Sequence, residues 1–211
     1  MGLATFRGGV HPFEGKELSE SKPVQVLMPK GDMVYPMSQH IGAPATPLVK
    51  KGDQVLVGQK IGEASGFISA NVICSVSGTV KAVEMRRVAS GAMVNSIVVT
   101  NDGEYNTVEG LGADRDPSTL SKQDIRTIVK EAGIVGLGGA GFPTNVKLSP
   151  KDENAIDYIL LNGAECEPYL TSDYRLMMEA PEQVIGGLKV VLQLFEKAKG
   201  VRTSLVFPYV R

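Results

Sequence analysis

Four glycines lie within the six residues from Gly136 to Gly141, in the stretch GLGGAGFPTNVK that ends at Lys147. Glycine has no Cβ, so consecutive backbone N–H groups in such a loop can converge on an anion. Lys147 adds a positive charge for the same anion, and Phe142 offers an aromatic face to a planar ring. The pattern predicts a binding loop for an anionic, planar cofactor. The alternative is a tight turn between a helix and a strand, with Phe142 in the core.

The spacing of Gly136, Gly138 and Gly141 also matches the GxGxxG pattern of dinucleotide-binding proteins. That pattern requires a strand before the glycines and a helix that starts within them. Here the sequence predicts a helix through Glu131 before the glycines, and Pro143 follows them. The loop is therefore predicted to differ from the ordinary Rossmann turn.

A second polar cluster, NGAECEP, places Asn162, Glu165 and Glu167 directly after the apolar run at 156–161. Ligands of open α/β sheets bind at the carboxyl ends of strands, where carboxylates accept hydrogen bonds from ribose hydroxyls or a nicotinamide amide. Paired carboxylates also serve acid–base hydrolysis, but nothing else in the chain supports a hydrolase. The other alternative is a solvated loop with an Asn turn.

The elements that position both clusters are predicted to form an α/β domain over residues 115–211. SKQD at 121–124 resembles a helix-capping box, and Gly133 suits the end of that helix. The run at 156–161 is typical of a strand buried in a parallel sheet.

A second helix of this domain is expected to begin at Pro181 and to end at Gly200. One more strand is expected at 204–210. The Gly/Asp-rich stretch 101–117 is expected to separate this domain from the preceding one.

Residues 35–102 contain short runs rich in Val and Ile, separated by glycine-containing turns. This spacing predicts a small β-barrel or sandwich, and its order resembles the biotinyl/lipoyl-type barrel-sandwich hybrid. A carrier of that type needs a lysine at a hairpin tip, but the corresponding residues 65–72 contain none. We therefore expect a structural or docking module. Residues 1–34 are expected to form an extended arm, because prolines interrupt any helix there.

Composition excludes several classes of protein. The formal net charge is -1, with 22 basic and 23 acidic residues, so nothing supports nucleic-acid binding. Cys74 and Cys166 are far apart and form no CxxC, which predicts reduced thiols and no metal site in this chain. We also expect no signal peptide and no transmembrane segment, since no run approaches the ~18 apolar residues that a membrane helix requires.

GLGGAGFPTNVKL together with LLNGAECEPYLTSDYRLM is similar to the C subunits of Rnf ion-translocating electron-transport complexes, the RnfC family. FRGGVHPFEGKEL and QHIGAPATPLVKKGD near the start resemble the same family. A more distant resemblance is to the flavin-bearing subunit of respiratory complex I. The resemblance covers residues 5–200 and implies a barrel-sandwich hybrid followed by an incomplete Rossmann-like flavin-binding domain, which is an α+β multidomain chain.

The resemblance implies that FMN and NAD(H) bind between the two polar clusters, with no side chain acting as a catalytic acid or base. The residues that would line this site are Gly136, Gly138, Gly139, Gly141, Phe142, Lys147, Asn162, Glu165 and Glu167. Phe142 would lie near the nicotinamide, Lys147 and Asn162 would contact FMN, and the two glutamates would lie where flavin and nicotinamide meet. Leu137 and Ala164 replace the Arg and Asp of the complex I relative, so no contact is implied for these two side chains.

The resemblance also implies that the chain is the first part of a longer subunit. A second glycine/glutamate loop and the cysteine motifs for two [4Fe–4S] clusters are absent from it. In the whole subunit, electrons would pass between NADH and ferredoxin through flavin and clusters. The subunit would contact other Rnf subunits, reach ferredoxin only indirectly, and sit on the cytoplasmic face of the membrane. The alternative is that this chain is a non-catalytic docking or assembly fragment.

Overall fold

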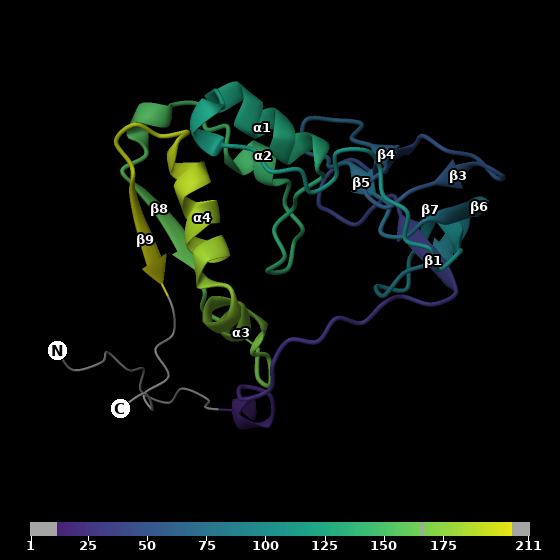
Figure 1. Ribbon diagram of the computed structural model, residues 1–211, viewed down its shortest axis with the longest axis horizontal. Helices are drawn as coiled ribbons and strands as arrows, with labels where there is room; N and C mark the ends of the chain where they lie inside the picture. The colour runs from purple at the N-terminus through teal and green to yellow at the C-terminus, as the bar shows by residue number, and fades with distance from the viewer. Residues whose placement is uncertain (1–11, 166, 204–211) are drawn as a thin grey trace. The chain divides into compact units, whose positions relative to one another are not determined.

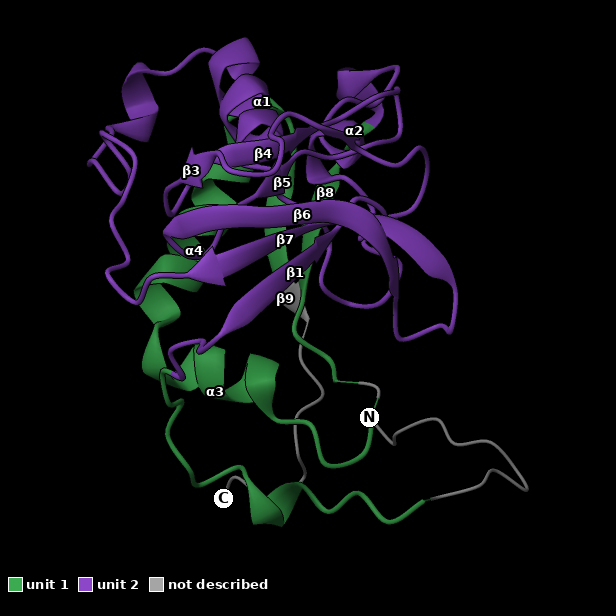
Figure 2. Cartoon of the chain, turned by 90° about the vertical axis from the view of Figure 1, so that its right-hand side faces the viewer, with its two compact units in different colours: residues 1–26, 156–211 green, residues 27–155 purple. Residues whose placement is uncertain are grey.

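The computed structural model describes residues 12–165 and 167–203, and these form parts of two compact units. One unit comprises residues 27–155, and the other combines residues 1–26 with residues 156–211 (Figure 2). The predicted order, a β module followed by an α/β part, is confirmed along the chain (Figure 1). The predicted domain boundaries at 34/35, 102 and 115 stay a prediction.

The β module of the 27–155 unit contains two antiparallel sheets. A four-stranded sheet has the order β1-β7-β6-β3, and a three-stranded sheet has the order β2-β4-β5. The strands are β1 (Asp32–Pro36), β2 (Thr46–Pro47), β3 (Gln54–Val55), β4 (Lys60–Glu63), β5 (Val72–Ile73), β6 (Gly78–Arg87) and β7 (Met93–Asn101). The sequence did not predict β1, which crosses the expected end of the arm and pairs with β7 from Asp32↔Thr100 to Pro36↔Ser96.

Both sheets contribute to one apolar core. Val55 and Ile61 are buried together with Val80, Ile97 and Met37. Cys74 is a free, buried thiol in this core, as predicted. Cys166 lies outside the described residues.

Helix α1 (Lys122–Glu131) follows the short 3-10 helix η2 (Pro117–Thr119) in the same unit. The predicted capping box is confirmed, because the Ser121 hydroxyl accepts from the Asp124 N–H and the Asp124 carboxylate accepts from the Ser121 N–H. Gly133 follows the helix with a φ of 64°, as expected. Helix α2 (Thr144–Lys147) and η3 (Glu153–Ala155) complete the unit.

The other unit is built on two parallel strands, β8 (Tyr158–Asn162) and β9 (Lys199–Thr203), with helices α3 (Ser172–Glu179) and α4 (Pro181–Leu192) between them in sequence. Strand β8 confirms the predicted strand and its parallel pairing. The predicted burial is wrong, because Tyr158 and Leu160 are exposed on a strand that pairs with β9 alone among the described strands. Pro181 occupies the first turn of α4 as predicted.

The predicted helix end at Gly200 is wrong. Helix α4 ends at Leu192, and Gly200 lies within β9. A Cβ at Gly200 would lie 2.9 Å from the Leu192 side chain and 3.1 Å from that of Leu188. The glycine thus permits close approach of the strand to α4 rather than ending the helix. The expected strand at 204–210 lies outside the described residues.

The N-terminal segment of this unit contains the 3-10 helix η1 (Lys16–Leu18) and is tied to residues about 150 positions later in the chain. The buried Lys16 Nζ donates to the carbonyls of Glu167 (3.2 Å) and Leu170 (2.7 Å). The Arg175 guanidinium donates to the Glu20 carbonyl at 3.0 Å. This part of the arm therefore packs on the loop that follows β8 and on α3.

Within the part of the chain that the structure describes, no helix has both the length and the apolar character needed to cross a membrane.

Candidate functional site

The glycine loop is held closed at its base by backbone hydrogen bonds. Val135 and Pro143 form an antiparallel bridge. The Gly136 N–H donates to the Phe142 carbonyl, and the Thr144 N–H donates to the Ile134 carbonyl, both at 2.9 Å. The loop is therefore a hairpin-like projection with a fixed base, not a strand-to-helix Rossmann turn, as predicted.

The tip of this loop is open. Leu137 is 95% exposed, and a Cβ at Gly138 or Gly139 would have no atom within 4 Å. Gly141 differs, because it is buried with a φ of 61°. The tip glycines thus leave backbone accessible to a ligand, whereas Gly141 fits the loop against the protein.

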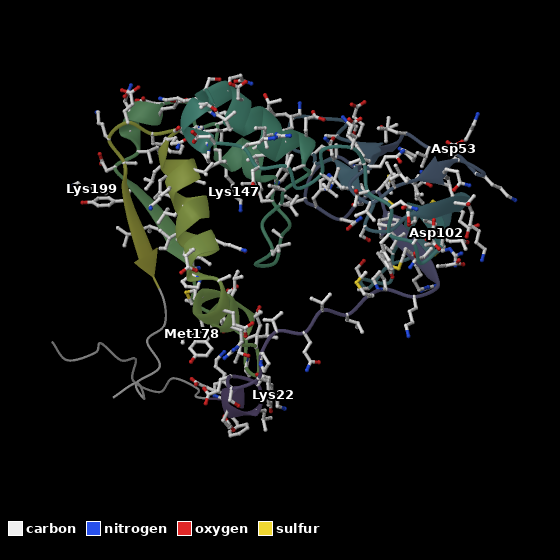
Figure 3. The ribbon with its side chains drawn as sticks, in the orientation of Figure 1. Lys22, Asp53, Asp102, Lys147, Met178 and Lys199 are labelled. Atoms are coloured by element: carbon white, nitrogen blue, oxygen red, sulfur yellow. The ribbon has the colours of Figure 1, made fainter. Side chains whose placement is uncertain are left out.

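Lys147 is the last residue of α2 and reaches back to the loop (it is labelled in Figure 3). A Cβ at Gly136 would lie 2.6 Å from the Lys147 Nζ, so the ammonium group lies directly beside this glycine. The lysine is exposed and Phe142 is half-buried. The structure therefore places a positive charge at the base of the glycine loop, whose tip is open.

In the second unit, Asn162 ends β8 and turns the chain. Its Oδ1 accepts from the Ala164 N–H at 3.0 Å, an arrangement that fixes an Asx turn. A cavity of about 410 Å³ lies beside β8 and is lined mainly by apolar residues of β8, α3 and α4. Asn162 and Asp173 are polar residues of the same lining. The Asn turn was one of the alternatives for this segment, and it lies at the edge of a real cavity.

The two glutamates of the second cluster are used differently. Glu165 Oε1 accepts from the Asp173 N–H at 2.9 Å and from the Ser172 hydroxyl at 3.3 Å. A carboxylate at the first turn of α3 satisfies free N–H groups and is favoured by the helix dipole. The exposed Glu167 is fixed through its backbone, whose carbonyl accepts from Lys16. Burial, and then the charges of Glu165 and Glu167, raise the pKa of Asp173.

The structure groups the predicted residues into two sets. One set, in the 27–155 unit, comprises Gly136, Gly138, Gly139, Gly141, Phe142 and Lys147; the other, in the second unit, comprises Asn162, Glu165 and Glu167. Sequence reasoning missed Lys16 and Asp173, which contact the second set. Only the short spacing between Glu167 and Asp173 signalled a carboxylate cluster, and no local pattern signalled Lys16.

Comparison with known proteins gives a family match for each part of the chain. Residues 4–104 match the family model of the RnfC barrel sandwich hybrid domain, and residues 129–203 match that of the Nuo51 FMN-binding domain. The chain belongs to the RnfC family. The predicted resemblance is thus confirmed, and the second match covers every predicted site residue.

Named relatives of this RnfC-family chain agree. It is 46% identical over 205 residues to the C subunit of the Na(+)-translocating ferredoxin:NAD(+) oxidoreductase complex of Acetobacterium woodii, covering 93% of the chain and 44% of that protein. Its identity to the proton-translocating counterpart of Clostridium ljungdahlii is 41% over 197 residues, covering 93% of the chain and 43% of that protein. For the C subunit of the ion-translocating oxidoreductase complex of Rhodobacter capsulatus the identity is 39%, with coverages of 96% and 38%. The chain spans less than half the length of these relatives.

Proposed function

We propose that this chain supplies the FMN-binding glycine loop of an RnfC-type subunit that transfers electrons between NAD(H) and ferredoxin. The observation that carries the proposal is the Lys147 ammonium beside Gly136, at the base of a glycine loop whose tip, Gly138 and Gly139, is open. An anion in the loop would be met by backbone N–H groups and by one positive charge. The match of residues 129–203 to the Nuo51 FMN-binding domain supports FMN as the ligand.

The residues present fit FMN. The tip glycines Gly138 and Gly139 leave space where a side chain would stand, which suits the close approach of a flat group. Lys147 would neutralise the phosphate, and the half-buried Phe142 would present its ring edge or face to the ligand. FMN, when bound, supplies exchange between two-electron and one-electron chemistry. The chain's own part is to bind, to orient and to set local charge.

Asn162 is proposed to hydrogen-bond the flavin, and Glu165 and Glu167 are proposed to lie where flavin and nicotinamide meet. Carboxylates accept hydrogen bonds from hydroxyl and amide groups but repel phosphate. Glu165 is committed to the first turn of α3, so Glu167 is the more available acceptor.

The other elements of the function are proposed from the relatives. Their names place them in ferredoxin:NAD(+) oxidoreductase complexes that translocate ions. We propose that other subunits of such a complex bind this chain, that ferredoxin is reached indirectly, and that the site faces the cytoplasm. [4Fe–4S] clusters are proposed for the part of RnfC-type subunits that this chain does not span.

The test is a titration of the chain with FMN, followed by flavin fluorescence and the visible spectrum, and then by anaerobic NADH. Binding that Lys147→Met weakens and Lys151→Met does not would support the proposal. Bleaching of the flavin band by NADH would extend it to electron transfer. The absence of FMN binding at high micromolar concentration would instead support a docking or assembly fragment.

A further inference from the structure

The barrel of the 27–155 unit touches the end of α1, and this contact determines where the glycine loop starts. The buried Asn71, just before β5, donates through Nδ2 to the carbonyls of Lys130 (3.2 Å) and Glu131 (3.4 Å). These carbonyls belong to the last helical turn, where partners within the helix run out. The Lys130 carbonyl also accepts from the Gly133 N–H at 3.0 Å, so Asn71 adds to the backbone hydrogen bonds at this helix end. Asn71 is therefore a C-terminal cap of α1 that is supplied by a different structural module.

Asn71 is itself held in place from the barrel side. Its Oδ1 accepts from the Ala64 N–H at 2.9 Å, so the amide group bridges the barrel and the helix. Lys60 of β4 reinforces the same junction, with Nζ 2.8 Å from Glu131 Oε2. Both contacts act on the last turn of α1.

Two glycines continue this contact into the loop. A Cβ at Gly133 would lie 2.4 Å from the Asn71 carbonyl oxygen. A Cβ at Gly141, at the far end of the loop, would lie 2.9 Å from the Gln39 carbonyl oxygen and 3.1 Å from the His40 Cα. The loop therefore rests on barrel backbone on both sides of its open tip.

Between these points the barrel and the loop base are not closely packed. A cavity of about 320 Å³ lies here, lined by Tyr35 and His40 on the barrel side and by Ala132, Gly133 and Val135 on the loop side. The hydrogen bonds around it therefore contribute to holding the loop base on the barrel. Asn71 donates two side-chain hydrogen bonds to the end of α1, and Lys60 donates one.

We infer that the barrel is the platform that positions the glycine loop, and that Asn71 is its positioning residue. The role in binding rests on the proposed FMN function, whereas the role in ordering the loop does not. The barrel thereby acts on cofactor binding without touching the cofactor. This gives the module a task that needs no lysine at a hairpin tip.

The test uses Asn71→Asp in the full chain, which keeps the acceptor toward Ala64 and removes both donations to α1. The matched control is Gln54→Ala, which removes a barrel hydrogen bond to Thr79 (2.8 Å) distant in sequence from α1. Lys60→Met is a second, milder variant should Asn71→Asp fail to fold. Amide hydrogen exchange is measured at Gly136 and Thr144, whose N–H groups close the loop base, and at the β6–β7 amides.

Amide exchange at Gly136 and Thr144 is expected to accelerate about five- to tenfold in Asn71→Asp, because this factor corresponds to the loss of about one hydrogen bond. The exchange rates of the β6–β7 amides are expected to stay unchanged. FMN affinity is expected to fall by a similar factor, and Gln54→Ala to change neither. Unchanged exchange at the loop base would overturn the inference, and so would uniform acceleration throughout the barrel. If the unsubstituted chain binds no FMN, the proposed function fails, while the exchange data still decide the positioning role.

Discussion

The Lys147 ammonium lies over the backbone of Gly136, so closely that a Cβ on that glycine would be 2.6 Å from Nζ. The two residues are separated in sequence by the whole loop and α2. The fold nevertheless brings the positive charge of Lys147 next to the backbone of Gly136. A side chain at position 136 would shift the flexible end of the lysine.

Replacing Lys147 with Met should lower FMN affinity about tenfold, because one charge-assisted hydrogen bond to phosphate is lost. Stability should be unaffected, since the side chain is exposed. Fluorescence titration measures the first effect and thermal unfolding the second. Lys151→Met, in the loop after α2, is the control. Equal affinity of both variants and the unsubstituted chain would remove Lys147 from the site.

The glycines of the loop should divide into two classes on substitution by alanine. Gly141→Ala should destabilise the 27–155 unit by about 1–3 kcal/mol, because φ is 61° and the Gln39 carbonyl is in the way. Gly138→Ala should change the free energy of unfolding by less than about 0.5 kcal/mol, since that position is open and outside the left-handed region. Denaturant unfolding compares the two. An unchanged free energy of unfolding in Gly141→Ala would contradict the close packing of Gly141 against the Gln39 carbonyl.

Lys16→Met should loosen the second unit. The buried ammonium donates to the carbonyls of Glu167 and Leu170. Its removal should therefore lower the free energy of unfolding by about 2 kcal/mol and leave both carbonyls without this donor. Limited proteolysis within residues 12–26 should accelerate, with mass spectrometry locating the cuts. Lys22→Met, which removes an exposed lysine of the same segment, is the control. Identical cleavage of both variants would show that Lys16 does not hold the arm.

The acidic cluster predicts a pH dependence with a defined sign. The pKa of Asp173 is raised by burial and by Glu165 and Glu167, so the folded chain binds this proton more tightly than the unfolded chain. Its stabilising contribution is fully present below the unfolded pKa of about 3.9 and is lost as pH rises through the folded pKa. Glu167→Gln should lower the pKa of Asp173 and flatten the fall in stability across mildly acidic pH.

Carboxyl NMR titration and thermal unfolding at several pH values check this prediction. Glu182→Gln, which removes an exposed carboxylate in the first turn of α4, is the control. A pKa of Asp173 that does not respond to Glu167→Gln would show that the charge of Glu167 does not act on this carboxyl group.

Elements with strong local signals were predicted correctly from the sequence. Ser121 and Asp124 form the expected capping box because its chemistry is complete within four residues. The strand at β8 and the start of α4 at Pro181 also depend on local composition. The open glycine loop was expected for the same reason, since its glycines are adjacent.

Features that depend on distant contacts were not predictable. Gly200 suits a helix end by its local sequence, but tertiary packing against Leu188 and Leu192 places it in a strand. The bonds of Lys16 to residues about 150 positions away, and the capping of α1 by Asn71, leave no periodicity in the sequence. These contacts fix where the site residues lie, whereas the sequence indicates only which residues they are.

The most direct test of the central claim is an FMN titration of the chain with isotope-labelled glycine, followed by NMR. The claim predicts amide shifts at Gly136, Gly138, Gly139 and Gly141 that saturate together, and none at Gly91 or Gly103. It further predicts that Lys147→Met weakens the shifts of the loop glycines. Shifts confined to glycines outside the loop, or no shift at millimolar FMN, would contradict the assignment of this loop to the flavin.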